Sequence, residues 1–344
     1  MERIRLAVDR GEKVLIYGDY DVDGVTASTL MFDALKLAGV EFVEVMLPDR
    51  FVDGYGMSAK VITRAKELGV GLVVTVDCGS GNGAIVEELN REGIDTIVTD
   101  HHECPLELPE AVAVINPKRQ DWQIPVEITE AEIDGLAGVG VAFKLAQALV
   151  ESGLIPSGQE KWLLDLAMIG TICDSMLLTG ENRILGFYGM KVLEKTRRVG
   201  LIELVRLAGV KKIDSDAIKF QIGPRLNAAG RLESAQISLD LLTTKSKAEA
   251  AQLAEKLEEL NKQRQGEQRR ALKEVDERGV LGLKQGSSEL PAVIVETGEW
   301  HEGIVGIIAG KLSDKYKRPA FALCEVTDGI LKGSGRSRSG RAGQ

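Results

Sequence analysis

The first half of the chain alternates short apolar runs with longer amphipathic stretches. The apolar runs are rich in β-branched residues and predict buried strands at 14–19, 42–48, 72–79, 95–100 and 111–117. Helical patterns lie between several of these runs, at 26–39, 58–69 and 84–93, and each ends in glycine, at Gly39, Gly69 and Gly93. Continuously apolar strands that alternate with helices predict a parallel sheet covered on both faces.

The second half has a different pattern. Helices are expected near 137–151, 161–173 and 183–209, followed by a loop at 223–232 with the sequence GPRLNAAGRL. From about Lys245 to Arg278 the chain is charged and strongly helix-forming, with one narrow apolar stripe of leucines at 253, 257 and 260. This predicts a long connecting helix, interrupted or bent near Gly266, that is most simply a solvated helix without chemistry.

Beyond this helix lies a small second α/β unit. PAVIVETG and PAFALCEV are typical of strands, and WHEGIVGIIAGKLSDKY between them is typical of a turn and a helix. Two or three strands make a thin sheet. The fold class is therefore α/β, with an N-terminal parallel-sheet domain at 1–210, a connecting segment at 211–285 and a partial C-terminal domain at 286–344.

Composition narrows the possible functions. The 344 residues are 44% hydrophobic and only 4% aromatic, and the formal net charge is -9. Such a chain has no global attraction for nucleic acid, so contact with DNA would need local basic patches or metal ions. The N-terminus is charged from its second residue, so no signal peptide is expected, and no run approaches the length of a membrane span. The cysteines, at 78, 104, 173 and 324, form no CxxC pair, which favours a reducing cytoplasm.

The stretch GDYDVDG at 18–24 begins like a calcium-binding EF-hand loop. An EF-hand needs a bidentate glutamate at its twelfth position and helices on both sides. With Asp19 as position one, the twelfth residue is Leu30, and the preceding apolar run predicts a strand. The EF-hand interpretation is therefore excluded.

Acidic residues instead follow three predicted strands. Asp19, Asp21 and Asp23 follow the first strand, Asp77 follows LVVTV, and Asp100 follows DTIVT. Because the carboxyl ends of parallel strands form one crevice, these acids should lie close together. If the backbone of the first group is extended, alternation could place its three acids on one side, and Gly24 could allow a tight turn into the next helix.

Clustered carboxylates repel one another and need compensating cations. No lysine or arginine lies within these motifs, so metal ions, with His101 and His102 as further ligands, are the natural compensation. The alternative for each single aspartate is a helix N-cap. Cys78 and Cys173 adjoin candidate ligands but are better interpreted as small core residues.

Several motifs in fixed order resemble the DHH phosphoesterase superfamily, and within it the RecJ family of single-strand-specific exonucleases. The superfamily motifs are GDYDVDG, VDCG, the triplet Asp100-His101-His102 and GTICD. The RecJ-like signatures are DRFVDGYGM at 49–57, GPRLNAAGRLESA at 223–235, EWHEGIVGIIAGKL at 299–312 and KGSGRS at 332–337. The resemblance covers nearly the whole chain.

The resemblance implies a centre of two divalent metal ions, Mn²⁺ or Mg²⁺. Asp21 would bind the first ion, with Asp19 as a further candidate ligand, and Asp77 would bridge both ions. The second ion would be held by Asp23, His101 and Asp174. His102 would face the scissile phosphate, and Asp100 would orient the histidine pair.

The resemblance also implies contacts with single-stranded DNA through fork-shaped and backbone donors. The candidate residues are Arg225, Asn227, Arg231, His301, Ser334, Gly335 and Arg336. Two departures stand out: Tyr17 occupies a position where many members have histidine, and the C-terminal DHHA1 domain would continue past Gln344. The chain therefore resembles a catalytic core that is incomplete at its C-terminus.

The expected activity is 5′-to-3′ exonuclease hydrolysis of single-stranded DNA in DNA repair and recombination. The expected protein is cytoplasmic and monomeric, without a membrane, and could work with a single-strand-binding protein or a helicase. Two alternatives stay open. One is a DHH enzyme for small substrates, such as a nanoRNase or a nucleotide phosphatase or pyrophosphatase, and the other is a non-catalytic replication scaffold.

Overall fold

The structure is a computed structural model that describes residues 1–119, 121, 135–279, 292–327 and 329–337. The chain divides into an N-terminal unit, Met1–Gly230 with Ser234–Glu258, and a C-terminal unit, Arg231–Glu233 with Glu259–Gln344. The boundary that the sequence suggests between 285 and 286 lies outside the described residues.

The N-terminal unit is built on a five-stranded parallel sheet. Its strands are β1 (Lys13–Tyr17), β2 (Val43–Met46), β3 (Val70–Val76), β4 (Asp95–Thr99) and β5 (Ala113–Ile115). Their spatial order is β2-β1-β3-β4-β5, and each neighbouring pair is parallel. The parallel sheet predicted from the apolar runs is confirmed.

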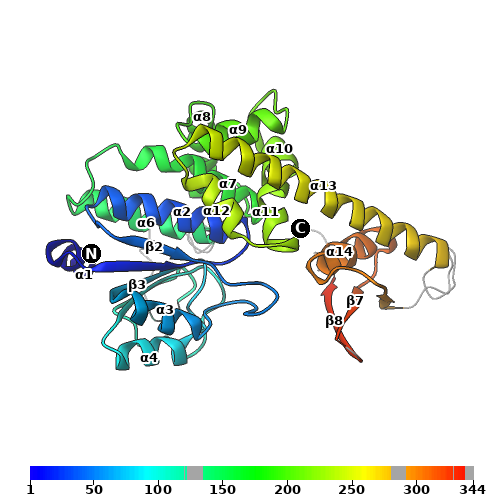
Figure 1. Cartoon of the computed structure of the whole chain (residues 1–344), viewed down its shortest axis with the longest axis horizontal. Coiled ribbons are helices and arrows are strands. Elements are labelled where there is room, and N and C mark those ends of the chain that lie inside the picture. Colours follow the sequence, from blue (N-terminus) through cyan, green and yellow to red (C-terminus); the bar gives the residue numbers. More distant parts are fainter. Residues whose placement is uncertain (120, 122–134, 280–291, 328, 338–344) are drawn as a thin grey trace. The chain divides into compact units, whose positions relative to one another are not determined.

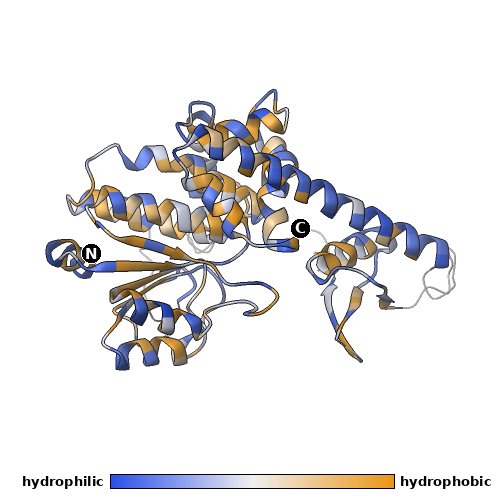
Figure 2. Ribbon diagram, in the orientation of Figure 1, coloured by the Kyte–Doolittle hydropathy of each residue, from blue (hydrophilic) through white to orange (hydrophobic). Residues whose placement is uncertain are grey.

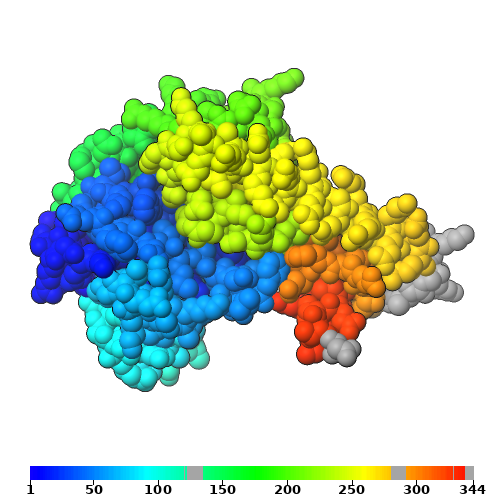
Figure 3. Space-filling view, viewed as in Figure 1, coloured from blue at the N-terminus to red at the C-terminus, as the bar shows by residue number. Residues whose placement is uncertain are grey.

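Helices cover both faces of this sheet, as Figure 1 shows. On one face lie α3 (Lys60–Leu68) and α4 (Gly83–Arg91), and on the other lie α2 (Val22–Leu37) and α6 (Gly138–Glu151). The predicted C-terminal glycines have left-handed φ angles of 98° at Gly39, 66° at Gly69 and 74° at Gly93. The pattern did not predict α1 (Glu2–Arg10), whose dark blue atoms lie at the surface in Figure 3.

Further helices complete the N-terminal unit. They are a 3-10 turn (Glu160–Leu163), α7 (Leu164–Cys173), α8 (Gly180–Leu193), α9 (Val199–Leu207), α10 (Ser215–Ala217) and α12 (Gln236–Thr243). The helical pattern at 183–209 is therefore two helices, α8 and α9. Between them Arg198 contacts the carboxylates of Asp33 and Asp165, with its side chain 9% exposed. A guanidinium buried in this way holds the chain to α2 and α7.

The segment GPRLNAAGRL is a helix, and its prediction as a loop is wrong. It forms α11 (Gly223–Leu232), directly after a π-helical turn (Ile218–Ile222). Proline cannot donate a backbone hydrogen bond and its ring crowds the preceding turn, so Pro224 is unfavourable inside a regular α-helix. The wider π turn directly before Pro224 lets the helical path continue.

The connecting helix α13 (Lys247–Arg278) is 32 residues long and runs through Gly266. The predicted interruption at Gly266 is therefore wrong. A single glycine costs a helix only about 1 kcal/mol, and its neighbours here are good helix formers. Figure 2 shows that α13 is mostly hydrophilic, as expected for a solvated helix.

The C-terminal unit is a small three-stranded sheet that shares a core with α14 (Val305–Tyr316) and with the second half of α13. It comprises β6 (Ile294–Thr297), a 3-10 turn (Glu302–Ile304), α14, β7 (Ala320–Thr327) and β8 (Ile330–Arg336). Strands β6 and β7 are parallel, whereas β7 and β8 are antiparallel. Trp300, Ile308 and Leu312 pack in its core. Among the described residues, no helix combines the length and the apolar character that spanning a membrane requires.

Candidate metal centre

The acidic residues that follow the strands meet at the carboxyl edge of the parallel sheet. Asp77 directly follows β3, Asp100 directly follows β4, and Asp19 lies two residues after β1. All three are buried, with at most 5% of each residue exposed. The cluster predicted from the strand ends is therefore present in the structure.

Asp21 and Asp23 reach the cluster by a different route from the one expected. Helix α2 begins at Val22, so Asp21 is its N-cap and Asp23 lies in its first turn. The Oδ1 atom of Asp21 accepts hydrogen bonds from the backbone N–H groups of Asp23 (2.8 Å) and Gly24 (3.1 Å). The extended arrangement of all three acids is therefore wrong, because the capping bonds start the helix early.

Gly24 is needed for a close approach and not for a turn. A Cβ atom at this helical position would lie 2.5 Å from the backbone oxygen of Asp19. No side chain fits in that space. Gly24 thus allows α2 to pack against the backbone that carries Asp19.

The N-terminus of α6 binds Asp23. The N–H group of Gly138 donates to Asp23 Oδ2 (2.7 Å), and that of Val139 donates to Asp23 Oδ1 (2.9 Å). Helix N-termini attract negative charge, so α6 offsets part of the carboxylate repulsion. A Cβ atom at Gly138 would lie 2.3 Å from Asp77 Oδ1, so this position also needs glycine.

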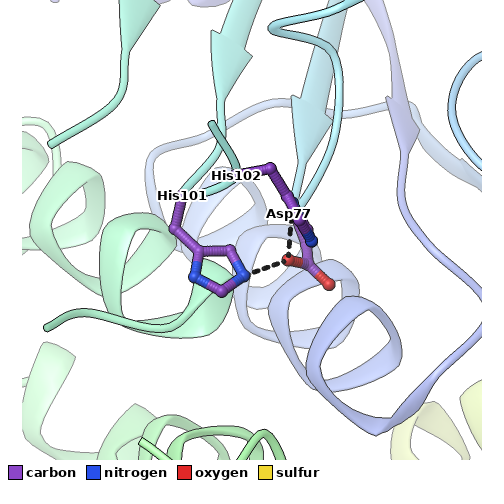
Figure 4. A group of neighbouring side chains, drawn as sticks. All are labelled: Asp77, His101 and His102. Carbon is purple, nitrogen blue, oxygen red and sulfur yellow. Dashed lines mark ion pairs between the residues drawn. The ribbon is translucent and has the colours of Figure 1, made fainter. Parts of the chain in front are cut away.

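His101 connects the carboxylates of three chain segments. Its Nε2 atom lies 3.1 Å from Asp77 Oδ1, 3.7 Å from Asp23 Oδ2 and 3.9 Å from Asp174 Oδ2. Figure 4 shows the His101 ring directed at Asp77, with His102 beside it. Asp174 caps the C-terminus of α7, which explains why periodicity alone did not single it out.

Asp100 organises the loop after β4. Its Oδ1 atom accepts the backbone N–H groups of His101 (2.7 Å) and His102 (3.1 Å) and lies 2.9 Å from His102 Nδ1. Its Oδ2 atom accepts the N–H group of Ser80 (2.9 Å). Burial raises the pKa of Asp100, but these hydrogen bonds outweigh burial and lower the pKa to about 2.

The pKa values of four other carboxylates in the cluster are raised. Burial, with repulsion from Asp21, raises the pKa of Asp19 to about 7 and that of Asp174 to about 6. Burial and the neighbouring carboxylates also hold the pKa values of Asp23 and Asp77 well above the ordinary range. Burial lowers the pKa of His101 to about 4, so its ring is neutral near pH 7. All these carboxylates can ionise together only if cations compensate their negative charge.

The residues present fit divalent metal ions. Their ligand atoms form three groups within 4.8 Å: Asp19, Asp21 and Asp77; Asp23, His101 and Asp174; and Asp77, His101 and His102. The buried Oδ1 atom of Asp77 accepts no hydrogen bond from the described residues. Oxygen donors with a few imidazoles suit Mn²⁺ and Mg²⁺.

The predicted DNA contacts divide between the two units. In the N-terminal unit, Arg225 and Asn227 lie on α11, and the Arg225 guanidinium already contacts Glu258 Oε2 (2.6 Å). In the C-terminal unit, Arg231 donates to the Gly303 oxygen (3.3 Å), and His301 Nδ1 accepts the Gly303 N–H (3.1 Å).

The remaining predicted contacts, Ser334, Gly335 and Arg336, lie on β8. Arg336 donates to Ser334 Oγ and to the Gly335 oxygen, both at 2.8 Å. These residues therefore form part of a strand.

Two polar residues that sequence analysis missed brace the acidic loops. Buried Asn116 directly follows β5, and its Nδ2 atom donates to Ser80 Oγ (2.9 Å) and to the His102 oxygen (2.9 Å). The strand-end rule that found Asp77 and Asp100 also marks Asn116, but only acids were considered. Tyr55 contacts His102 Nδ1 (2.8 Å), and only its place in the motif DRFVDGYGM pointed to it.

Tyr17 and the two cysteines have structural roles in this arrangement. Tyr17 is fully buried and donates its hydroxyl to the Gly56 oxygen (3.1 Å). Cys78 packs in the core below the site, and the Sγ atom of Cys173 lies where a Cβ of Gly223 would fall. None of the three belongs to the groups of candidate ligands found among the described residues.

The fold is that of a DHH domain, and residues 13–171 match the DHH family, N-terminal domain. The single-stranded-DNA-specific exonuclease RecJ of Bacillus subtilis is 40% identical over 342 residues, which are 98% of this chain and 41% of that protein. A crystal structure of exonuclease RecJ bound to manganese is 32% identical, with a TM-score of 0.84, and covers 98% of this chain and 80% of that one. The chain therefore belongs to the RecJ family.

A second RecJ structure, from Thermus thermophilus in complex with Mn²⁺, is 31% identical with a TM-score of 0.81. It covers 98% of this chain and 46% of that one. The chain thus spans between about two-fifths and three-fifths of the length of the curated relatives it matches.

Proposed function

We propose that this chain is the catalytic core of a single-stranded-DNA-specific exonuclease that uses two divalent ions, Mn²⁺ or Mg²⁺. One observation carries the proposal: buried carboxylates and a neutral imidazole from separate strand ends form adjoining ligand groups in a RecJ-family chain. The relatives are named as single-stranded-DNA-specific exonucleases, and two related structures are described with manganese.

The ligand groups suggest how the two ions are held. Asp21, with Asp19, would hold the first ion, and Asp23, His101 and Asp174 would hold the second. Asp77 shares one group with Asp19 and Asp21 and another with His101, so it would serve both ions. When bound, such an ion pair activates a water molecule and neutralises charge on the phosphoryl oxygens.

Hydrogen bonds within the protein preorganise the side chains of this site. The two N–H groups of α6 hold both oxygens of Asp23, and the capping bonds of α2 fix Asp21. Asp100 fixes the backbone of both histidines and holds His102 by its Nδ1 atom. His102 is more exposed than His101 (side chain 43% against 10%), which supports a role beside the scissile phosphate.

Basic and backbone donors supply the DNA contacts in this proposal. Arg225, Asn227 and Arg231 offer donors to the DNA backbone, and His301 with Ser334, Gly335 and Arg336 offers further contacts from the C-terminal unit. Arg336→Ala should weaken single-strand binding and reduce its salt dependence. Unchanged binding across a salt series would remove Arg336 from this role.

The proposed cellular setting follows from the family. The reaction runs 5′ to 3′ and serves DNA repair and recombination in the cytoplasm, and the chain acts as a monomer. Partner proteins of the single-strand-binding or helicase type would deliver the strand.

The direct test compares substrates. Purified chain with Mn²⁺ or Mg²⁺ is offered end-labelled single-stranded DNA, duplex DNA, dinucleotides and pyrophosphate. The proposal predicts metal-dependent shortening of the single strand from its 5′ end, and much slower turnover of the others. Preferential hydrolysis of dinucleotides or pyrophosphate would favour the small-substrate alternative, and folded protein that binds no metal would favour a scaffold.

A further inference from the structure

Tyr55 contacts the site but belongs to none of its ligand groups. Its Oη atom lies 2.8 Å from His102 Nδ1, and the two rings meet edge-on with centroids 5.1 Å apart. The residue is 54% exposed, whereas the carboxylates behind His102 are buried. Tyr55 is therefore accessible to a substrate that reaches His102.

The hydrogen bonds around His102 fix where the protons lie. Asp100 Oδ1 accepts two backbone N–H groups, so it is an acceptor, and it also lies 2.9 Å from His102 Nδ1. Two acceptors at this distance would repel, so Nδ1 carries the hydrogen. This N–H group is then shared between two acceptors, Asp100 Oδ1 and Tyr55 Oη. The hydroxyl hydrogen of Tyr55 therefore points away from His102, toward another acceptor.

The residues directly after Tyr55 are anchored to two other parts of the chain. The buried Tyr17 hydroxyl donates to the Gly56 oxygen (3.1 Å) and accepts the Ser58 N–H (3.2 Å). Asn82 Oδ1 accepts the Met57 N–H (3.2 Å). These bonds to the residues directly after Tyr55 hold its ring in place beside His102.

We propose that Tyr55 is a substrate-contacting residue, whose hydroxyl donates a hydrogen bond to a non-bridging oxygen of the phosphate that His102 faces. This rests on the proposed phosphodiester hydrolysis. A neutral donor suits the position, because it stabilises phosphoryl charge without pairing with the nearby carboxylates. Tyr17 is a positioning residue for Tyr55.

The first test compares Tyr55→Phe with the wild-type chain and with Tyr188→Phe, an exposed tyrosine on α8. The phenylalanine keeps the ring beside His102 and removes only the hydroxyl. We expect Tyr55→Phe to lower kcat/KM on single-stranded DNA roughly 10- to 100-fold, mostly through kcat. Calorimetric Mn²⁺ affinity and Tyr188→Phe kinetics should stay at wild-type values. Normal turnover of Tyr55→Phe would overturn the proposal.

The second test reads the protons directly. The chain has only three histidines, so nitrogen NMR of ¹⁵N-histidine-labelled, metal-free protein is readily assigned with a His102→Gln variant. We expect His102 to carry its hydrogen on Nδ1, and this resonance to shift in Tyr55→Phe. A hydrogen on Nε2 alone, or an Nδ1 resonance that Tyr55→Phe leaves unmoved, would overturn the arrangement.

Tyr17→Phe tests the anchoring without touching the site. It should lower kcat in the same direction as Tyr55→Phe, by less, with faster amide exchange at 56–58. Equal exchange and equal kcat would remove Tyr17 from this role. A wild-type chain that leaves single-stranded DNA intact would defeat the proposed function, while the NMR result would still decide the Tyr55–His102 arrangement.

Discussion

At the scale of single residues, the backbone itself is shaped around the carboxylates. Asp77 has a left-handed φ of 61°, a conformation that costs a residue other than glycine about 1–2 kcal/mol. Its carboxylate is buried against Gly138, where no side chain fits. A strained backbone persists where the surrounding structure enforces it, and such positions cluster at functional sites.

Gly138→Ala should damage the centre without unfolding the protein. The new methyl group would lie 2.3 Å from Asp77 Oδ1, so the carboxylate must move. We expect Mn²⁺ affinity to fall at least ~10-fold, as it does when a residue that orients a metal ligand is removed. Isothermal titration calorimetry measures the affinity, and circular dichroism confirms the fold.

Gly140→Ala is the matched control on the same helix. The three atoms nearest its Cβ would all belong to the Leu136 side chain, the closest at 3.2 Å, and none to a carboxylate. It should therefore bind Mn²⁺ like the wild type. Equal Mn²⁺ affinity for the Gly138→Ala and wild-type proteins would contradict the account of this contact.

The residue types of the site were predictable, but their geometry was not. Strand-end counting found Asp19, Asp77 and Asp100, because parallel strands end at one edge. It placed Asp23 on extended backbone. Residues after a strand can stay extended or begin a helix, and here the capping bonds of Asp21 begin α2 at Val22. Asp174 was identified only through the family motif. It caps the C-terminus of α7, and the hydrophobic pattern of a helix does not show that its C-terminus lies beside the strand ends.

At the scale of elements, the apolar runs predicted the sheet and the helices that cover it. Elements with weak or interrupted hydrophobic patterns were harder to predict. The segment 223–232 was predicted as a loop, but the π turn before Pro224 leads directly into a helix, and such turns leave no signature in hydropathy. Gly266 suggested a break in α13, although one glycine among helix formers is tolerated.

Gly266→Ala should stabilise the protein. A Cβ atom there meets nothing within 4 Å, so alanine adds helix propensity without a clash. We expect the free energy of unfolding to rise by about 1 kcal/mol, measured by urea denaturation. Gly209→Ala, at a left-handed φ of 66°, should lower it by about 1–2 kcal/mol. A destabilised Gly266→Ala protein would show that the helix does bend there.

At the scale of the whole molecule, protons and metal ions compete for the same carboxylates. In the metal-free fold the pKa is about 7 for Asp19 and about 6 for Asp174, above the ordinary value of 3.8. The folded state therefore binds more protons than the unfolded state between about pH 4 and 7. The stability that these groups contribute is present at low pH and is lost as the pH rises through 7.

Divalent ions should therefore stabilise the fold more at pH 8 than at pH 6. At 100 times the dissociation constant, a single ion adds about 2.7 kcal/mol, and protons that must be displaced reduce this at pH 6. Thermal unfolding with Mn²⁺ and with chelator, at both pH values, measures the difference. A larger Mn²⁺ effect at pH 6, or none at either pH, would contradict this description of the centre.

The most direct test of the central claim is the metal-dependent nuclease rate of Asp77→Asn. Asparagine keeps the shape of the side chain and tolerates the left-handed backbone better than alanine, so the fold should survive. With the proposed bridging carboxylate removed, we expect release of nucleotides from end-labelled single-stranded DNA in Mn²⁺ to fall at least ~100-fold, and Asp77→Ala to lose activity likewise. A folded Asp77→Asn protein with near-normal turnover would contradict the two-metal account.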